Sequence, residues 1–266
     1  MSRFSARFDA LRAASRKALV PFITAGDPSI EATVPVMHAL VQAGADVIEL
    51  GVPFSDPMAD GPVIQRSSER ALARGAGLSY VLECVRAFRE RDAATPVVLM
   101  GYLNPVEIRG SARFAEEANA AGVDGVLLVD LPPEECDEFR QAFAAHGIAL
   151  ILLASPTTTD ARLQMLCSAA EGYLYYVSFA GVTGADHLDW GGASEKLRQL
   201  RALSKAPVVA GFGIKDAASA AAMARHADGV VVGSALVAAL SEAVDVGDAV
   251  KRASAFLLPL REALDR

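Results

Sequence analysis

The sequence has few cysteines and histidines, and neither residue type is spaced as in a metal site. Three cysteines and four histidines occur among 266 residues, and no C-x-x-C pair is present. Isolated cysteines are typical of reduced thiols in a reducing compartment, rather than of a disulfide framework or a zinc site. We therefore expect a cytoplasmic protein without a bound metal.

Long hydrophobic runs are also missing. A helix that spans a membrane needs about 20 consecutive and mostly apolar residues, and no run in this chain reaches that length. The first residues, M-S-R-F-S-A-R-F-D-A-L-R, lack the apolar stretch of a secretory signal peptide. We expect neither a membrane span nor an export signal.

Basic residues are fewer than acidic residues. The chain has 25 Lys and Arg residues against 32 Asp and Glu residues, which gives a net charge of −7. Without a cluster of basic residues, neither nucleic acid nor an anionic membrane is expected as a partner. A site for a small anion would have to be local, built from backbone N–H groups or a few side chains.

What the chain does contain is a regular series of short apolar runs. Runs of about 5–7 β-branched and aliphatic residues, bounded by Gly, Pro or Asp, are typical of buried parallel strands. Eight such runs cover residues 18–25, 46–51, 96–101, 124–130, 148–154, 172–178, 207–213 and 228–233. Helix-like segments lie between them, for example at 29–44, 111–122, 134–147 and 216–227. Further helices are expected before the first run, between Asp60 and Leu78, and after Gly233.

One joint between a helix and a strand recurs along the chain. A-G-A-D-V (43–47), A-G-V-D-G (121–125) and H-A-D-G-V (226–230) each place Asp directly before an apolar strand. Repeated βα units of this kind, eight in number, close naturally into a barrel. We therefore predict an α/β fold, a single-domain (β/α)8 TIM barrel with extra helices over residues 1–266. A doubly wound open sheet is the alternative, but the strand count and the lack of G-x-G-x-x-G after the first strand disfavour it.

The active site of such a barrel lies at the carboxyl ends of its strands. Glu49 ends the second strand, and side-chain alternation in D-V-I-E-L allows it to point into the barrel mouth. Burial there would raise its pKa toward the range that is useful for general acid–base catalysis. The alternative is a Glu paired with a buried Arg or Lys, but no basic residue stands in the strand-like runs.

Asp60 follows in the loop G-V-P-F-S-D-P-M-A-D-G-P. As a second carboxylate near the mouth, it is a candidate catalytic residue. The alternative is purely structural, because Asp is common in turns and at helix N-termini.

Glycines follow the last three strands, where barrels often bind phosphate. They occur in A-G-V-T-G-A (180–185), G-F-G (211–213) and V-G-S-A (232–235). Glycines allow backbone N–H groups to approach an anion, and a helix that begins near Ser234 adds its positive dipole end. The other strand ends are apolar or aromatic and would suit a flat hydrophobic group: Phe22, Met100, Tyr102, Leu127, Val129, Leu153, Tyr175 and Phe212.

Five motifs together resemble the tryptophan synthase α subunit family. They are P-F-I-T-A-G-D-P, E-L-G-V-P-F-S-D-P-M-A-D-G-P-V-I-Q, M-G-Y-L-N-P, Y-V-S-F-A-G-V-T-G-A and G-F-G-I. The similarity extends from about Phe4 to Ala263. It implies cleavage of indole-3-glycerol phosphate to indole and D-glyceraldehyde 3-phosphate. It also implies a partner, a β subunit that carries pyridoxal phosphate in an α2β2 heterotetramer, while this chain itself needs no cofactor.

The resemblance also implies roles for individual residues. Glu49 would be the general acid–base, and Asp60 would accept a hydrogen bond from the indole N–H. The phosphate group would lie at Gly184, Gly213, Gly233 and Ser234, and the substrate pocket would comprise Phe22, Met100, Tyr102, Leu127, Tyr175, Thr183 and Phe212. The loops 51–60 and 179–192 would act as lids, with Asp56 and Asn104 near the partner.

Two other functions remain as alternatives. Another phosphosugar barrel enzyme, such as an epimerase, would usually need His and Asp metal ligands at the strand ends, and none is visible. A catalytically silent subunit that binds a phosphorylated metabolite and activates a partner is disfavoured by the presence of both Glu49 and Asp60.

Overall fold

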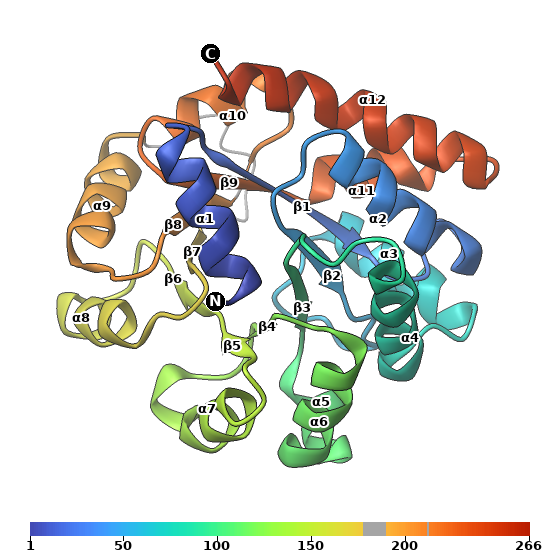
Figure 1. Cartoon of the computed structure of the whole chain (residues 1–266), viewed down its shortest axis with the longest axis horizontal. Coiled ribbons are helices and arrows are strands. Elements are labelled where there is room, and N and C mark those ends of the chain that lie inside the picture. The colour runs from blue at the N-terminus through green and yellow to red at the C-terminus, as the bar shows by residue number, and fades with distance from the viewer. Residues whose placement is uncertain (178–189, 212) are drawn as a thin grey trace.

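The computed structural model describes residues 1–177, 190–211 and 213–266. Within these ranges, nine strands form one sheet whose neighbouring strands are all parallel. The strands are β1 (Ala18–Thr24), β2 (Ile48–Gly51), β3 (Val97–Gly101), β4 (Gly125–Leu128), β5 (Ala149–Leu150), β6 (Leu152–Ala154), β7 (Leu174–Val177), β8 (Val208–Gly211) and β9 (Gly229–Val232). The ring of strands is enclosed by helices (Figure 1).

The helices lie mostly where the sequence predicts them. They are α1 (Arg3–Ala13), α2 (Thr33–Gln42), α3 (Pro62–Ala73), α4 (Leu78–Arg89), α5 (Leu103–Arg109), α6 (Ser111–Ala121), α7 (Asp137–Ala144), α8 (Asp160–Ala169), α9 (Trp190–Leu203), α10 (Ala217–Ala224), α11 (Ser234–Ser241) and α12 (Val246–Leu264), with 3-10 turns η1 (Ile30–Ala32) and η2 (Pro133–Glu135). The helix predicted over 29–44 is shorter, because its first residues form η1. Pro35 lies in the first turn of α2, where a missing N–H is tolerated.

The strand order closes the sheet into a barrel. It runs β5-β4-β3-β2-β1-β9-β8-β7-β6, and its two ends, β5 and β6, are consecutive parts of one stretch that is divided at Ile151. The Ile151 N–H still donates to the Val126 carbonyl on the β4 side (2.9 Å). Leu152 then pairs with Leu174 of β7. The nine strands therefore correspond to the eight predicted runs, which confirms the (β/α)8 barrel over the doubly wound sheet.

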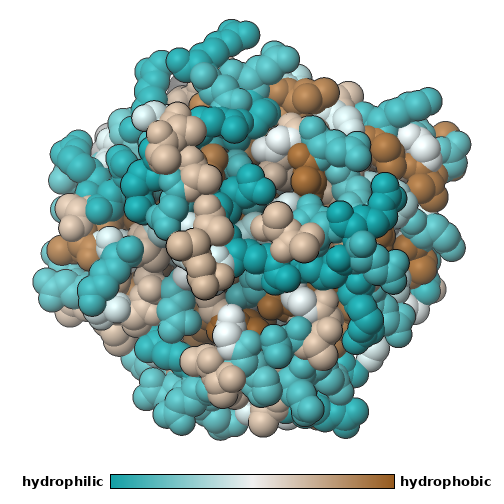
Figure 2. Space-filling model, in the orientation of Figure 1, coloured by the Kyte–Doolittle hydropathy of each residue, from teal (hydrophilic) through white to brown (hydrophobic). Residues whose placement is uncertain are grey.

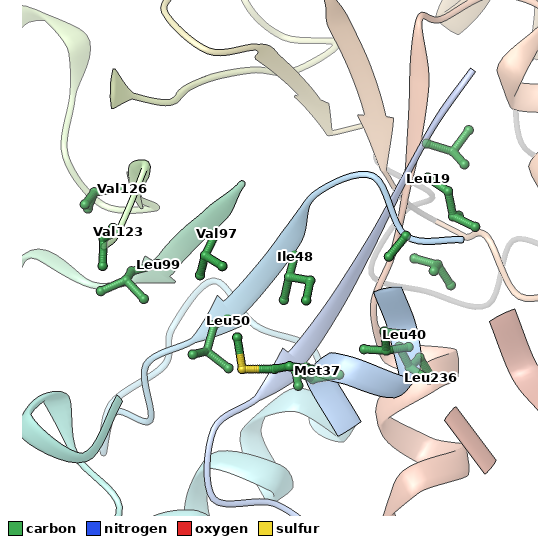
Figure 3. Close-up of a cluster of buried hydrophobic side chains, with 14 of the residues drawn as sticks. Leu19, Met37, Leu40, Ile48, Leu50, Val97, Leu99, Val123, Val126 and Leu236 are labelled. Carbon is green, nitrogen blue, oxygen red and sulfur yellow. The ribbon is translucent and has the colours of Figure 1, made fainter. Parts of the chain in front are cut away.

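Side chains alternate between two separate apolar layers. Residues such as Ile48, Leu50, Val97 and Leu99 face outward and pack under the helices, and Figure 3 shows Leu50 beside Met37 of α2. Their neighbours in sequence, such as Val47 and Val98, face inward and fill the barrel. Each large aliphatic side chain buried in this way contributes roughly 1.5–3 kcal/mol. The same alternation turns Glu49 toward the interior.

Helix α1 closes the amino-terminal end of the barrel. Its Phe4 and Phe8 belong to the interior cluster and contact the Tyr173 ring, with centroids 5.9 Å and 6.3 Å apart. Gly125 and Gly172 leave room for Phe4, because a Cβ atom at either position would come within 3.2 Å of that ring. Figure 1 shows α1 lying in front of the strands. Among the described residues, α1 therefore covers the amino-terminal end, and we expect a ligand to approach the interior from the opposite, carboxyl end.

The three repeated Asp residues brace neighbouring strands in the same way. Each carboxylate accepts a backbone N–H from one of the first two residues of the preceding strand: Leu19 to Asp46 (2.9 Å), Val97 to Asp124 (2.8 Å) and Val208 to Asp228 (2.9 Å). Each also pairs with an arginine, as Asp124 does with Arg89 at 2.6 Å. The sequence echo is therefore a structural repeat that fixes the start of three strands.

The outer face is mainly polar. In the view of Figure 2, hydrophilic residues cover most of the surface, and apolar residues occur in small separate groups. Among the described residues, no helix combines the length and the apolar character that a membrane crossing requires.

Candidate active site

Glu49 lies inside the barrel and is fully buried. One carboxyl oxygen, Oε1, accepts a hydrogen bond from the Tyr173 hydroxyl. The other, Oε2, is buried without a hydrogen-bond partner among the described residues. Burial raises the pKa of Glu49 to about 8, and the hydrogen bond from Tyr173 opposes this rise only in part. The carboxyl group is therefore mostly protonated at neutral pH, and it can both donate and accept a proton near that pH.

Tyr173 is the partner that sequence reasoning missed. It directly precedes β7, its side chain is fully buried, and its ring packs on Phe4 and Phe8 of α1. Burial and the neighbouring Glu49 hold the pKa of its hydroxyl well above the usual range, so it remains a hydrogen-bond donor. Alternation along G-Y-L-Y-Y places Tyr173 and Tyr175 on the same interior face, and this was the available signal.

Asp60 lies in the loop between β2 and α3 and is half-buried. Its Oδ2 accepts a hydrogen bond from the Tyr102 hydroxyl (3.0 Å), which in turn accepts one from the Ala59 N–H (3.0 Å). Burial raises the pKa of Asp60, whereas the hydrogen bond from Tyr102 lowers it. Tyr102 therefore stabilises the ionised form of Asp60.

A pocket at the carboxyl end of the barrel brings five predicted residues together. Phe22, Asp60, Met100, Tyr102 and Val129 line it, and Ile64, Thr24 and Ser68 complete much of its wall. Leu127 and Tyr175 belong instead to the interior apolar cluster, against which Met100 also packs. The pocket is narrow, with a volume of about 10 Å³, so its walls have to move apart before a flat apolar group can enter with the Asp60 carboxylate at its edge.

The phosphate-binding candidates are only partly described. Gly233 is the N-cap of α11, and Ser234 is the first, exposed residue of this helix. A Cβ atom at Gly233 would lie 3.6 Å from Phe22, so this helix start borders the pocket. Gly213 has a left-handed backbone, with φ of 67°. Thr183, Gly184 and Phe212 lie outside the described residues.

Helix α11 directs free N–H groups outward at its first turn. Its first backbone hydrogen bond runs from Val237 to the Gly233 carbonyl (3.0 Å). The N–H groups before Val237 then have no partner within the helix, as at every helix start, and the dipole makes this end positive. Such an end favours an anion.

Comparison of the whole sequence with known families identifies the family to which the chain belongs. A family model described as tryptophan synthase alpha chain matches residues 8–263. The chain belongs to the tryptophan synthase alpha chain family. It is therefore a lyase of tryptophan biosynthesis, and its reaction is the cleavage of indole-3-glycerol phosphate to indole and D-glyceraldehyde 3-phosphate. The resemblance seen in the sequence motifs is confirmed.

Individual members of the tryptophan synthase alpha chain family are similar over their full length. The chain from Xanthomonas oryzae pv. oryzae (strain MAFF 311018) is 76% identical over 267 residues, covering 100% of both chains. The chain from Xanthomonas campestris pv. campestris (strain 8004) is 75% identical and covers 99% of this chain and 97% of its own. A crystal structure of the alpha subunit from Legionella pneumophila str. Paris superposes with a TM-score of 0.93 at 48% identity, over 100% of this chain and 99% of that one.

Proposed function

We propose that Glu49 and Asp60 divide the work of the cleavage between them. Glu49 moves protons, and Asp60 holds the charge that develops on the indole ring. The observation that carries this proposal is the contrast in their environments. Glu49 is fully buried with a pKa raised to about 8. Asp60 is half-buried, and although burial also raises its pKa, the hydrogen bond from Tyr102 opposes this rise and favours the ionised form. Two carboxyl groups whose environments differ in this way suit an acid and an anion.

The proton transfers then balance as follows. Protonated Glu49 donates its proton to ring carbon C3, and the ring nitrogen becomes positively charged. The Asp60 carboxylate accepts the N–H hydrogen bond and stabilises this cation. Ionised Glu49 next removes the proton of the C3′ hydroxyl. The bond between C3 and C3′ breaks, its electrons neutralise the ring, and indole and the aldehyde are released with Glu49 protonated again.

Glu49 has to change its orientation to do this. Its carboxyl group is bonded to Tyr173, which packs against α1 at the closed end of the barrel. The pocket with Asp60 lies at the open end. We infer that substrate binding releases Glu49 from Tyr173 and that its side chain turns toward the mouth. Closure of the loop 51–60 would exclude water from the transfers.

The phosphate group of the substrate belongs at the first turn of α11. Gly233 borders Phe22, which also lines the pocket, so phosphate and indole would occupy neighbouring places. Backbone N–H groups and the helix dipole provide binding without a cluster of basic side chains. Gly213 and Gly184 remain proposed members of this site, and Thr183 and Phe212 remain proposed members of the substrate pocket.

A β chain with pyridoxal phosphate is the proposed partner, in an α2β2 heterotetramer in which it consumes the indole. The exposed side of the loop with Asp56 and Met58, together with Asn104, is the proposed contact surface. The buried free thiols Cys84, Cys136 and Cys167 support a cytoplasmic location. Copurification with a β chain would test the assembly, and equal rates of indole release with and without that chain would argue against coupling.

The division of work is tested by measuring indole release from indole-3-glycerol phosphate. Glu49→Gln keeps the shape but cannot transfer the proton, so substrate should still bind while turnover falls by about a thousandfold or more. Asp60→Asn should lose about a hundredfold, because it cannot offset the ring cation. Glu83→Gln, on the exposed face of α4, is the matched control. Turnover in Glu49→Gln that equals the control would contradict the assignment.

A further inference from the structure

Tyr102 makes three separate contacts with the loop that carries Asp60. Its ring stacks on Phe54, with centroids 5.0 Å apart and planes 26° apart. Its hydroxyl accepts the Ala59 N–H and donates to Asp60 Oδ2, each at 3.0 Å. Tyr102 itself is only 4% exposed and directly follows β3. A fixed side chain of the barrel therefore supports a loop that is otherwise exposed.

Gln65 holds the same loop through the loop backbone. It lies in the first turns of α3, and its Nε2 donates to the Asp60 carbonyl (2.9 Å) and to the Pro57 carbonyl (3.4 Å). The Asp60 N–H also donates to the Pro57 carbonyl (3.1 Å), which closes a turn over 57–60. Gln65 thus ties both ends of this turn to a helix, and it does so without touching the carboxylate.

We propose that Tyr102 and Gln65 are positioning residues that hold Asp60 in its working place before the substrate arrives. The proposal rests on the proposed role of Asp60 as the acceptor of the indole N–H. A carboxylate that is already fixed stabilises the ring cation without having to reorganise during the reaction. Misplacement of such a group by about 1 Å can lower the rate by about a hundredfold.

The two residues act differently, and this difference makes them separable. Tyr102 donates to the carboxylate itself, so it sets both the place and the charge of Asp60. Two other titratable groups interact electrostatically with this pair. Tyr175 interacts with Asp60 from the barrel interior, and Asp130 interacts with Tyr102 from the end of β4. Both stay in place when only the Tyr102 hydroxyl is removed. Gln65 binds carbonyl groups alone and fixes position without affecting charge.

The test compares Tyr102→Phe and Gln65→Met with the wild type across a pH series of kcat and KM for indole release. Both variants should lower kcat by about ten- to a hundredfold, with a smaller change in KM. The hydrogen bond from Tyr102 lowers the pKa of Asp60, so Tyr102→Phe should also move the acidic limb of kcat/KM to higher pH. Gln65→Met should leave that limb in place.

Tyr80→Phe is the matched control for loss of a tyrosine hydroxyl. The Tyr80 hydroxyl donates to the Ile30 carbonyl and contacts Thr33 Oγ1, both at 2.7 Å and remote from the pocket. Loss of this hydroxyl should reduce the free energy of unfolding without moving the acidic limb of kcat/KM.

Asp60→Asn separates the two levels of the proposal. Suppose that Asp60→Asn has a lowered kcat. The positioning role is then overturned if Tyr102→Phe and Gln65→Met keep the kcat of the wild type, or if they lose only free energy of unfolding. Wild-type kcat in Asp60→Asn itself would instead overturn the role of Asp60.

Discussion

The Tyr173 hydroxyl donates a hydrogen bond to Glu49 in the interior of the barrel, 124 residues away in sequence. Tyr173 provides a neutral donor, and no basic side chain is bonded to Glu49 among the described residues. Desolvation therefore dominates, and the pKa of Glu49 rises to about 8. A cationic partner would have lowered this pKa instead and removed the proton that the reaction needs.

Glu49 should make the stability of the protein depend on pH. Its folded pKa of about 8 lies above the ordinary 4.5, so its stabilising contribution is full below pH 4.5 and is lost as the pH rises through 8. Glu49→Gln lacks this loss. We expect the variant to exceed the wild type in free energy of unfolding by on the order of 5 kcal/mol at pH 9, and by only about 1 kcal/mol at pH 5. Urea unfolding at both pH values checks this, and an equal difference at both would contradict it.

Removal of the Tyr173 hydroxyl should shift the basic limb of activity. The hydrogen bond lowers the pKa of Glu49, so Tyr173→Phe should raise it further, and kcat/KM should be retained to higher pH. The phenylalanine ring keeps the contacts with Phe4 and Phe8. Tyr176→Phe is the control, since the buried Tyr176 hydroxyl has no hydrogen-bond partner among the described residues. If the basic limb of kcat/KM lies at the same pH in both variants, Tyr173 does not set the pKa of Glu49.

A negative charge at the start of α11 should weaken phosphate binding. Ser234→Asp places a carboxylate beside the free N–H groups of the helix, and we expect glycerol 3-phosphate to bind at least about tenfold more weakly. Ala238→Asp, on the exposed face of the same helix, adds equal charge away from the first turn. Calorimetric titration of both variants measures the effect, and equal dissociation constants would remove Ser234 from the site.

The Asp braces should matter for stability rather than for catalysis. Asp124 pairs with Arg89 (2.6 Å) and Arg3 (2.9 Å) and accepts the Val97 N–H. Asp124→Asn leaves Arg89, whose side chain is only 11% exposed, without its counter-charge. We expect a loss of about 3 kcal/mol in unfolding free energy. Asp160→Asn breaks an exposed pair with Lys196 and should cost less than about 1 kcal/mol. Similar urea midpoints for the two variants would show that Asp124 does not stabilise the fold more than an exposed carboxylate does.

Periodicity was sufficient to predict the barrel. The apolar runs became parallel strands, and alternation placed Glu49 inside, because each position along a strand fixes one of two faces. The division of the fifth strand at Ile151 could not be predicted. It depends on a change of pairing from β4 to β7 that leaves no local mark in I-A-L-I-L-L-A.

The hydrogen-bond partners of the site residues were less predictable from the sequence than the places of these residues in the barrel. Tyr102 was predicted as a wall of the substrate pocket, and it does line a pocket with Asp60, but its hydroxyl contacts depend on where a distant loop settles. Gln65 carried no chemical signal, since an amide in an amphipathic helix is ordinary. The hydrogen bond between Tyr173 and Glu49 connects the start of β7 with β2, which are not neighbours in the sheet, and only the closed barrel brings them together.

The most direct measurement is the pKa of Glu49 itself, obtained from the carboxyl carbon signals of 13C-labelled glutamate by NMR over a pH titration. One glutamate should titrate near pH 8 in the wild type and be missing from Glu49→Gln, and its midpoint should coincide with the basic limb of kcat/KM. If every glutamate signal completes its titration below about pH 6, Glu49 is ionised at neutral pH, and the proposed order of proton transfers is wrong.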